Sequence, residues 1–528
     1  MLRSLHRSLV PLARRPARFT RSVRFTSSKQ NDPADLPPAQ THSVQEGFAQ
    51  APIFVLNVAK RFVRFSAIGL VGLGLTFALA FESAHIWVEN VEFALPKEET
   101  NDSETKRWEW NLEKENWSGD VDAAGTDPGL GVKGCHLVRA AWMAQYWGLG
   151  QTSTAVVSSD AVSQGSSGGG LSGPRGLIII DPRLVKAEVF LREAISIAEK
   201  KKSNSGKLRP WTMSQLLSLH ASILERMGPE SMITAESQYE RAWSSQPFIS
   251  PQSARIALKL GDLNRRLGND TEALTWWDRA IHIAQPVGQI GSTVAVPPIM
   301  PSSPYSQRSL LFTLSSLSAF YATSGDFTKA QSIAEASLQL IRSVRQPDSI
   351  ASTSPAYALH ALTLLQRSSV LDIHLAEVLY AQRKSTTSAS VCTPWLTKAA
   401  ESSQRVLRGL AGLPPNSGSP SLSITGRVDS SFSKSPSLSK PASSLYRDAR
   451  RTAAEAWNLT GILLEGKDPR GALIAYANAV HFAGAGAGID DTGDIDGGKP
   501  ADGVLKADWD VIWSNYVRLK TKMDGTRG

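Results

Sequence analysis

Residues 65–81 read FSAIGLVGLGLTFALAF, seventeen consecutive residues without a charged side chain. Continuing the stretch to residue 87 gives the roughly twenty residues that a helix needs to cross a bilayer. Basic residues precede the stretch and acidic residues follow it: Lys60, Arg61 and Arg64, then Glu82, Glu89 and Glu92. The pattern predicts one transmembrane helix over residues 65–87. A buried core helix is the alternative for a segment of this length.

The basic residues of the chain are concentrated at its beginning. The net charge is +9, and residues 1–64 hold eleven Lys or Arg against three Asp or Glu, a net charge of +8. A surface that neutralises phosphates needs clustered Lys and Arg in the folded part, where the excess here is only +1. We therefore expect no nucleic-acid partner. The two cysteines exclude a disulfide scaffold.

The first thirty residues have the composition of a mitochondrial presequence. Residues 1–30 contain seven Arg, one Lys and no acid, with Ser, Leu and Ala between them. A disordered basic tail is the alternative. Residues 31–64 are expected to form a polar and then basic spacer. Lys and Arg residues next to a membrane span are favoured on the side of the membrane that is not reached by translocation, which here is the matrix. Because the basic residues precede the span, the N-terminus is predicted in the matrix and the remainder in the intermembrane space.

Tryptophan is concentrated after the apolar stretch. Five of the fourteen tryptophans fall in residues 97–150, within a juxtamembrane segment that we bound at 88–150. Dense tryptophan indicates packing or an anchor at the lipid interface, and an aromatic patch that docks a partner is the functional alternative. Residues 151–180 are rich in Gly and Ser and are expected to form a linker.

Residues 181–483 show paired helical periodicity and no convincing alternation of strand residues, which predicts an all-α fold. A Ser-rich insert is expected at 414–444, a flexible acidic loop at 484–503 and a C-terminal capping helix at 504–528. The helices are expected over 184–199, 213–227, 232–244, 254–267, 270–284, 306–323, 326–344, 368–383, 394–410, 445–464 and 468–483.

A repeat can be aligned within these pairs. Residues 254–280 carry Leu-Gly in the first helix, Gly in the turn, then Ala, a large aromatic and Ala in the second. This spacing is similar to the tetratricopeptide pattern, in which small residues let the two helices cross closely and the aromatic fills the space to the next repeat. The residues expected to pack the repeats are Gly261, Ala273, Trp277 and Ala280, with Gly325, Ala330, Gly461 and Tyr476 in weaker copies.

The resemblance implies a solenoid of four to six degenerate repeats whose first helices line a peptide groove. Lys, Asn and Arg do not recur there as a clamp for a chaperone's C-terminal carboxylate would require. An apolar, mixed-charge groove suits unfolded or extended protein segments. Solvated faces of a scaffold are the alternative. The expected groove residues are Arg255, Leu258, Asp262, Arg265, Arg266, Phe312 and Asn458.

The sequence shows no catalytic, metal-binding or cofactor-binding motif. The nine histidines include no pair four residues apart, and residues 493–499 fail as a phosphate loop because Pro500 stands where Ser or Thr should bind Mg²⁺. We expect no enzyme, no cofactor and no small-molecule substrate. An enzyme hidden in the Trp-rich segment would require Asp127, His136 and Arg139 to converge on a pocket.

Together, the presequence, one span and degenerate repeats resemble the fungal inner-membrane adaptors of the i-AAA protease. The resemblance implies a non-catalytic protein of mitochondrial quality control that binds unfolded client proteins and delivers them to a membrane AAA protease. A repeat-containing assembly factor or scaffold for a respiratory-chain complex is the alternative, and a membrane-structural role without a client is a further one.

Overall fold

A computed structural model describes residues 47–94, 102–113, 115, 117, 125–148, 155–157, 178–204, 207–285, 296–347, 349–350, 352–383, 388–413, 428–485, 499–501, 504 and 506–525. The expected presequence and residues 31–46 of the expected spacer lie outside them. The chain divides into two compact units, Met1–Ala78 and Leu79–Gly528. The first unit contributes the greater part of one long helix, and the second contains all the other helices of the described residues.

The first helix, α1 (Gly47–Trp87), contains the apolar stretch. Its helical part begins well before residue 65, so residues 47–64 of the expected spacer are helical. The stretch long and apolar enough to cross a membrane is Val58–Glu92, with a hydropathy of 1.8. Within it the Thr76 hydroxyl donates to the carbonyl of Gly72 at 2.9 Å, which satisfies a polar group inside an apolar segment. A π-helical turn, Val88–Glu92, follows α1.

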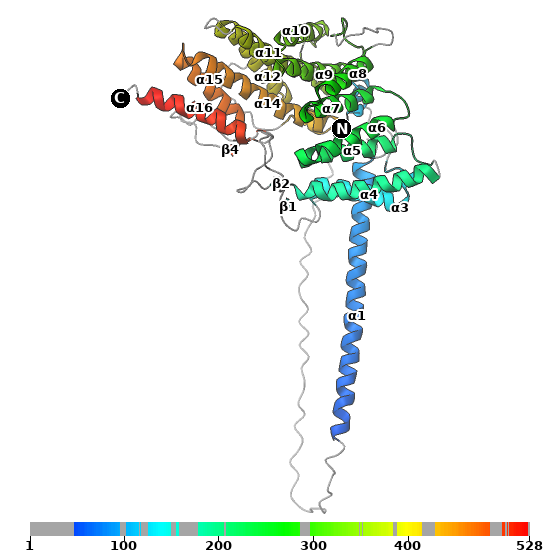
Figure 1. The fold of residues 1–528 in the computed structure, drawn as a ribbon. Helices are drawn as coiled ribbons and strands as arrows, with labels where there is room; N and C mark the ends of the chain where they lie inside the picture. The colour runs from blue at the N-terminus through cyan, green and yellow to red at the C-terminus, as the bar shows by residue number, and fades with distance from the viewer. Residues whose placement is uncertain are drawn as a thin grey trace, which may run out of the picture. The chain divides into compact units, whose positions relative to one another are not determined.

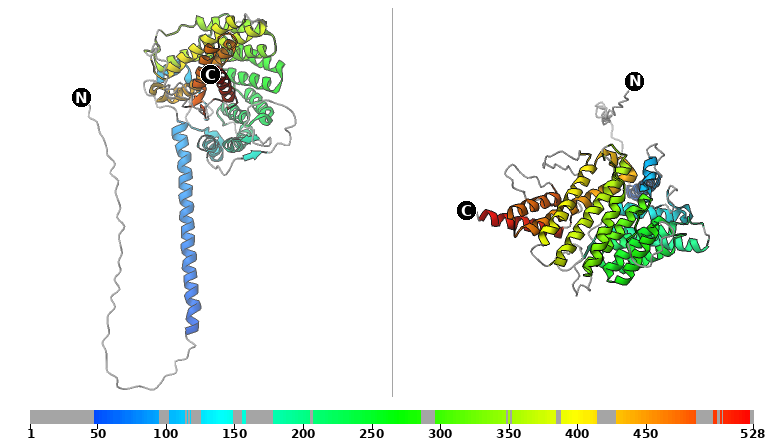
Figure 2. Two further views of the ribbon diagram at one scale, coloured as in Figure 1. Left: turned by 90° about the vertical axis from the view of Figure 1, so that its left-hand side faces the viewer. Right: turned by 90° about the horizontal axis from the view of Figure 1, so that it is seen from above.

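The second unit is an array of helical hairpins, as expected for an all-α repeat fold (Figure 1). Successive pairs contact each other as α3/α4, α5/α6, α7/α8, α9/α10, α11/α12 and α14/α15, and α16 packs on α15. Figure 2 shows the helices following one another across the unit in chain order. The helices are α3 (Gly131–Trp147), α4 (Pro182–Asn204), α5 (Thr212–Met227), α6 (Met232–Ser244), α7 (Pro251–Leu267), α8 (Asp270–Ala284), α9 (Pro304–Thr323), α10 (Phe327–Ser343), α11 (Pro355–Arg383), α12 (Ser388–Leu410), α13 (Ser430–Ser433), α14 (Pro436–Leu464), α15 (Pro469–Ala483) and α16 (Lys506–Gly525).

Local sequence signals set many of these helix starts. Six helices of the described part begin at a proline, whose fixed φ suits the first helical turn and whose missing N–H is not needed there. At α7, Ser250 and Ser253 form a reciprocal capping box, and the Asp326 and Asp468 carboxylates accept from backbone N–H groups at the starts of α10 and α15. Caps and prolines therefore fix where each hairpin turns.

Two hairpins share the same close approach at a glycine. In α7/α8 the Trp277 indole lies over Gly261, where a Cβ atom would come within 2.5 Å of the ring. In α14/α15 the Tyr476 ring lies over Gly461 in the same way, at 2.6 Å. In α9/α10 Ser318 takes the glycine position and its hydroxyl donates to the carbonyl of Ala330. The same close crossing at a small residue therefore recurs in three hairpins, α7/α8, α9/α10 and α14/α15.

The turn and second-helix positions of the pattern are equally regular. Gly268 and Gly325 end α7 and α9 with φ of +84° and +82°, a conformation that favours glycine. Ala273, Ala280 and Ala330 are buried where their helices cross. The repeat pattern therefore describes both the crossing points and the turns.

The structure departs from the sequence expectations in three places. The expected Ser-rich insert at 414–444 is wrong at its end, because residues 428–444 form α13 and the first turns of α14, with Phe432, Leu438 and Ala442 buried. α11 likewise begins thirteen residues before the expected 368. Two short antiparallel pairs, β1 (Ala155–Val157) with β2 (Ile178–Ile180) and β3 (Gly484–Ala485) with β4 (Lys499–Pro500), occur within the expected linker and the expected acidic loop.

The Trp-rich segment supplies the missing half of the first hairpin. Residues 187–194 of α4 match a second repeat helix without a first one in the sequence. In the structure α3 packs against α4, and Val138, Ala141 and Trp142 are buried in a core shared with Leu191 and Ala194. Part of the segment after the apolar stretch therefore belongs to the repeat array.

Candidate functional site

The first helices of four successive hairpins form one row. α7 contacts α9, α9 contacts α11, and α11 contacts α14. All seven expected groove residues lie on α7, α9 and α14 of this row. We call the side of the row that carries the starts of α7, α9, α11 and α14 the inner face. The structure brings the expected residues onto one row, and most of them interact with other parts of the same chain.

The three expected arginines of α7 have partners within the chain. Arg255 donates to the carbonyl of Glu113 at 3.2 Å. Arg265 donates to Asp270 at 2.9 Å and to the Thr323 hydroxyl of α9 at 2.7 Å. Arg266 forms an ion pair with Glu225 of α5. Arg265 and Arg266 therefore join neighbouring helices.

The other expected groove residues are also in contact. The Trp277 indole N–H donates to the Asp262 carboxylate at 3.1 Å, and burial raises the pKa of that carboxyl. The Arg367 guanidinium of α11 lies 3.5 Å from the centre of the Phe312 ring. Asn515 of α16 donates to the Asn458 side-chain oxygen at 3.1 Å, and Leu258 packs against two core clusters.

A second part of the Trp-rich segment crosses the inner face. It comprises α2 (Asp102–Arg107), a 3₁₀ turn η2 (Trp110–Leu112) and the residues around them. We call residues 102–113 together with Glu115 the crossing segment. It contacts residues of α7, α9, α11 and α14 that lie 142 to 325 positions later in the sequence. Of the expected groove residues, Arg255 bonds to this segment. The segment therefore covers the end of the row at which its helices start, and the other expected residues lie further along the helices.

Two tryptophans of the crossing segment anchor it. Trp110 is 1% exposed, its indole N–H donates to the carbonyl of Ala356 at 2.9 Å, and it packs in the core between α11 and α14. The Trp108 ring stacks on Tyr357 at 4.2 Å between centres, with planes 5° apart. Both indoles use residues at the start of α11 as their sockets. Such aromatic anchors carry much of the energy of a peptide interface.

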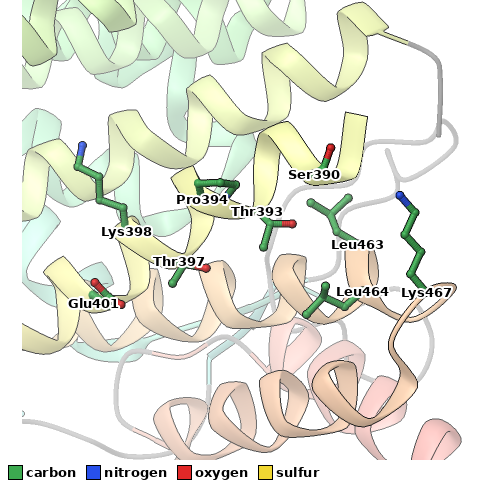
Figure 3. Close-up of a pocket in the computed structure, with 9 residues that line it drawn as sticks. All are labelled: Ser390, Thr393, Pro394, Thr397, Lys398, Glu401, Leu463, Leu464 and Lys467. Carbon is green, nitrogen blue, oxygen red and sulfur yellow. The ribbon is translucent and has the colours of Figure 1, made fainter. Parts of the chain in front are cut away.

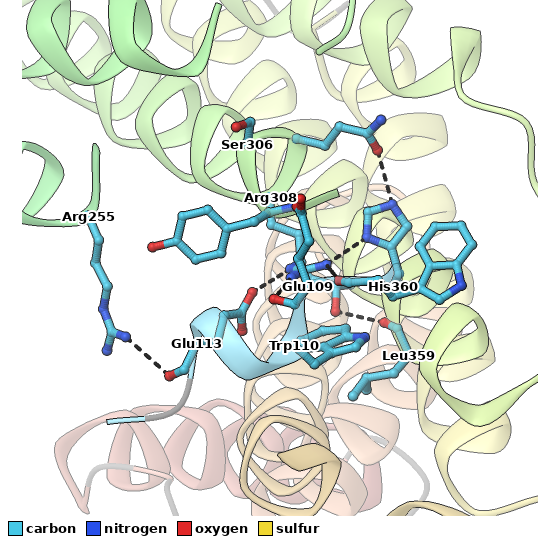
Figure 4. A network of polar contacts seen from close by, with 12 residues as sticks. Glu109, Trp110, Glu113, Arg255, Ser306, Arg308, Leu359 and His360 are labelled. Atoms are coloured by element: carbon cyan, nitrogen blue, oxygen red, sulfur yellow. Dashed lines mark hydrogen bonds and ion pairs between the residues drawn. The ribbon is translucent and has the colours of Figure 1, made fainter. Parts of the chain in front are cut away.

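Arg308 of α9 lies at the centre of the polar contacts (Figure 4). It is 1% exposed, forms an ion pair with Glu113 and donates to the carbonyls of Trp108 and Glu109, each at 3.2 Å. Its guanidinium lies 3.9 Å from the centre of the Trp110 ring. A buried cation is stable only when it is paired and hydrogen-bonded, so Arg308 depends on the crossing segment.

Acidic side chains fix the middle and the C-terminal end of the crossing segment. The Glu109 carboxylate accepts from the Ser303 hydroxyl at 2.5 Å and from the Tyr305 N–H at 2.8 Å, at the start of α9. Glu115 forms an ion pair with Lys440 of α14 at 3.0 Å and accepts from the Tyr146 hydroxyl. Burial alone would raise the pKa of Glu115, but its contacts with Lys440 and Tyr146 lower it below its ordinary value.

His360 completes the network as a neutral acceptor. Its Nδ1 accepts from Arg308 at 3.0 Å, and its Nε2 donates to the Gln307 side-chain oxygen at 3.0 Å. The tautomer follows because the guanidinium can only donate. Burial, and then the charge of Arg308, lower the pKa of His360 to about 3. Protonation of this ring would remove an acceptor and place a second cation beside Arg308.

We expect the free energy of unfolding to fall on acidification, in part through His360. Because its pKa is about 3 when folded and about 6.5 when unfolded, the unfolded chain binds more protons between those values. The contribution of neutral His360 to the free energy of unfolding is fully present above pH 6.5 and is lost as the pH falls towards 3. His360 should contribute a loss of about 2 kcal/mol between pH 7 and pH 5. Urea unfolding at both pH values checks this, with His360→Gln as the comparison; equal losses in both proteins would contradict it.

The three groups of the enzyme alternative do not converge. Asp127 accepts from the backbone N–H groups of Gly129 and Arg209 and from the Thr212 hydroxyl. His136 pairs with Glu82 at 3.1 Å, and Arg139 pairs with Glu89 at 3.2 Å. Each side chain therefore has a separate structural partner. No group of three His, Cys, Asp or Glu that could hold a metal lies among the described residues.

A pocket of about 640 Å³ opens between α12 and the end of α14 (Figure 3). Lys398 at its wall pairs with the buried Asp372 at 2.9 Å. The pocket is lined by Ser390, Thr393, Pro394, Thr397, Lys398, Glu401, Leu463, Leu464 and Lys467.

No family model and no curated protein matches this chain. A solved structure similar to it is the human IFIT1 dimer with m7Gppp-AAAA, at 11% sequence identity, covering 76% of this chain and 81% of that chain, with a TM-score of 0.20. A likeness at this level carries no argument about function. The assignment of the chain as a helical-repeat scaffold therefore rests on its own hairpins and their packing.

The sequence expectations missed the residues that the structure gathers at the inner face. Glu109, Trp110, Glu113 and Arg308 come from segments about 200 residues apart, and no local periodicity relates them. The density of tryptophan and glutamate in residues 104–117 was the available signal. It indicated packing or docking without indicating the surface involved.

Proposed function

We propose that this chain is a non-catalytic adaptor of the mitochondrial inner membrane, which binds protein clients through its helical repeat and presents them to the i-AAA protease. The observation that carries the proposal is the row of four first helices, which the short helical turns of the crossing segment cover. A single helix long enough to cross a membrane precedes it in the chain. Repeats of this kind act by binding protein segments.

The mitochondrial location and the topology rest on the sequence. The basic, acid-free residues 1–30 support import, and the charges flanking the apolar stretch support a matrix N-terminus with the repeat in the intermembrane space. The protease partner rests on the resemblance to the fungal inner-membrane adaptors.

A respiratory-chain assembly factor or scaffold is the second candidate, and one observation favours it. The expected groove residues already have partners within the chain, so a folded client would meet other surfaces of the array. The open pocket between α12 and α14 is one such surface. This candidate predicts stable association with assembly intermediates.

Affinity purification of the tagged chain from detergent-solubilised mitochondria tests the proposal, with protease protection measured on the same organelles. We expect an AAA protease to co-purify, and the C-terminal part to be digested only after the outer membrane is ruptured. Recovery of respiratory-complex subunits without the protease would favour the assembly factor. Digestion in intact organelles would contradict the inner-membrane location.

A further inference from the structure

The inner face carries a cation from three of its first helices. Arg255, Arg308 and Lys440 lie near the starts of α7, α9 and α14, respectively, and all three contact the crossing segment through Glu113 or Glu115. Arg367 lies further along α11 and interacts first with Asp448 and Asp262, and then with Glu113. A repeated positive charge along a row of helices selects an acidic partner.

Beside these cations, the face has two sockets for indole rings. One encloses Trp110 and offers the Ala356 carbonyl as an acceptor for the indole N–H. The other is the face of the Tyr357 ring on which Trp108 stacks. The indole N–H adds a second donor to a carbonyl that α11 already uses in its own helical bonding. The face therefore accommodates tryptophan next to carboxylates.

The contacts that hold the crossing segment are those of a bound peptide. They join parts of the chain 142 to 325 residues apart and consist of side-chain anchors, ion pairs and hydrogen bonds to the ends of helices. A segment held in this way differs from a separate ligand only in its high local concentration. Because Arg308 is buried and pairs with Glu113, leaving the face empty would be costly, whereas exchange for a similar peptide would restore every contact.

We propose that the inner face recognises an acidic, tryptophan-containing segment of a partner protein, and that the crossing segment is a competitor for this site built into the chain. The inference rests on the proposed function and states the chemistry of its client. A partner binds by displacing the crossing segment from α7, α9, α11 and α14. Weakening the crossing segment should therefore open the site to a peptide added from outside.

The experiment uses the full-length chain in detergent micelles and a fluorescein-labelled peptide with the sequence of residues 102–115, DSETKRWEWNLEKE. Fluorescence anisotropy measures its affinity for the wild type and for Glu113→Gln, Trp110→Ala and the control Glu230→Gln, whose carboxylate lies on an exposed turn. We expect Glu113→Gln and Trp110→Ala to bind the peptide at least about tenfold more tightly than the wild type, because less of the site is blocked. The control should bind like the wild type.

A second peptide, with both tryptophans replaced by Ala and Glu109 and Glu113 by Lys, should not bind any variant. The proposal is overturned if Glu113→Gln remains folded at the temperature of the measurement, as its circular dichroism shows, and binds the first peptide no better than Glu230→Gln. It is also overturned if the second peptide binds as well as the first. Dimers of the wild type at the same concentration, formed by the crossing segment of one copy binding the inner face of another, would overturn it too, because the occupant would then be a second copy of this chain. Recovery of the protease from mitochondria tests only the proposed function, so the two can fail separately.

Discussion

Replacing Arg308 with Met is expected to lower the free energy of unfolding by about 3–5 kcal/mol, because it removes one partner of a buried ion pair. The Glu113 carboxylate and the carbonyls of Trp108 and Glu109 would lose their donor, and Trp110 would lose the cation against its ring. Methionine keeps the length and apolar character of the stem, so the loss reports the guanidinium. Urea unfolding of the full chain, followed by tryptophan fluorescence, measures it.

Arg279→Met is the matched control. The Arg279 guanidinium also lies over an indole, that of Trp276 at 4.3 Å, but its side chain is exposed. We expect this substitution to cost no more than about 1 kcal/mol. Equal losses for the two variants would mean that Arg308 acts only through its contact with an aromatic ring, and that the crossing segment does not depend on the buried charge.

Replacing Gly261 with Ala is expected to destabilise the chain by about 2 kcal/mol, although alanine is the better helix former by about 1 kcal/mol. The new Cβ would lie 2.5 Å from the Trp277 indole. That ring cannot move aside easily, because it is fully buried and its N–H donates to Asp262. Helix α8 would have to shift away from α7. Thermal unfolding followed by circular dichroism measures the change.

Gly466→Ala provides the comparison, because no atom lies within 4 Å of the position that its Cβ would take. We expect that substitution to change the stability by less than about 0.5 kcal/mol. Gly461→Ala, whose Cβ would meet the Tyr476 ring at 2.6 Å, should instead behave like Gly261→Ala. A Gly261→Ala protein as stable as the wild type would contradict the close crossing inferred from the repeat pattern.

The sequence predicted the helices well wherever their apolar residues recur with the helical period. α6 and α8 have the expected bounds, and most other helices between α4 and α15 differ from them by a few residues. The period is reliable here because each hairpin buries one stripe against its neighbours, so local pattern and tertiary packing agree. The prolines at the starts of α11 and α14 carried further information, which periodicity alone did not use.

The candidate site was only half predictable. Its scaffold follows from the repeats, but its occupant does not, because the crossing segment is short and joins the face through single side chains. Glu113 and Arg308 can be recognised as partners only after four hairpins have been placed side by side. Arg255 was among the expected groove residues, whereas Arg308 and Lys440 were missed, because their contacts with distant residues leave no local pattern in the sequence.

The crossing segment also determines the order in which the chain can complete its fold. The hairpins from α5/α6 to α14/α15 close loops of a few residues, whereas the ion pair between Glu115 and Lys440 closes one of 325 residues. Contacts between distant residues form slowly, because the chain loses the entropy of loop closure before the new contact lowers its free energy. The segment emerges early from the ribosome and then waits for α14, so the hairpins assemble first and Trp108 and Trp110 are buried last.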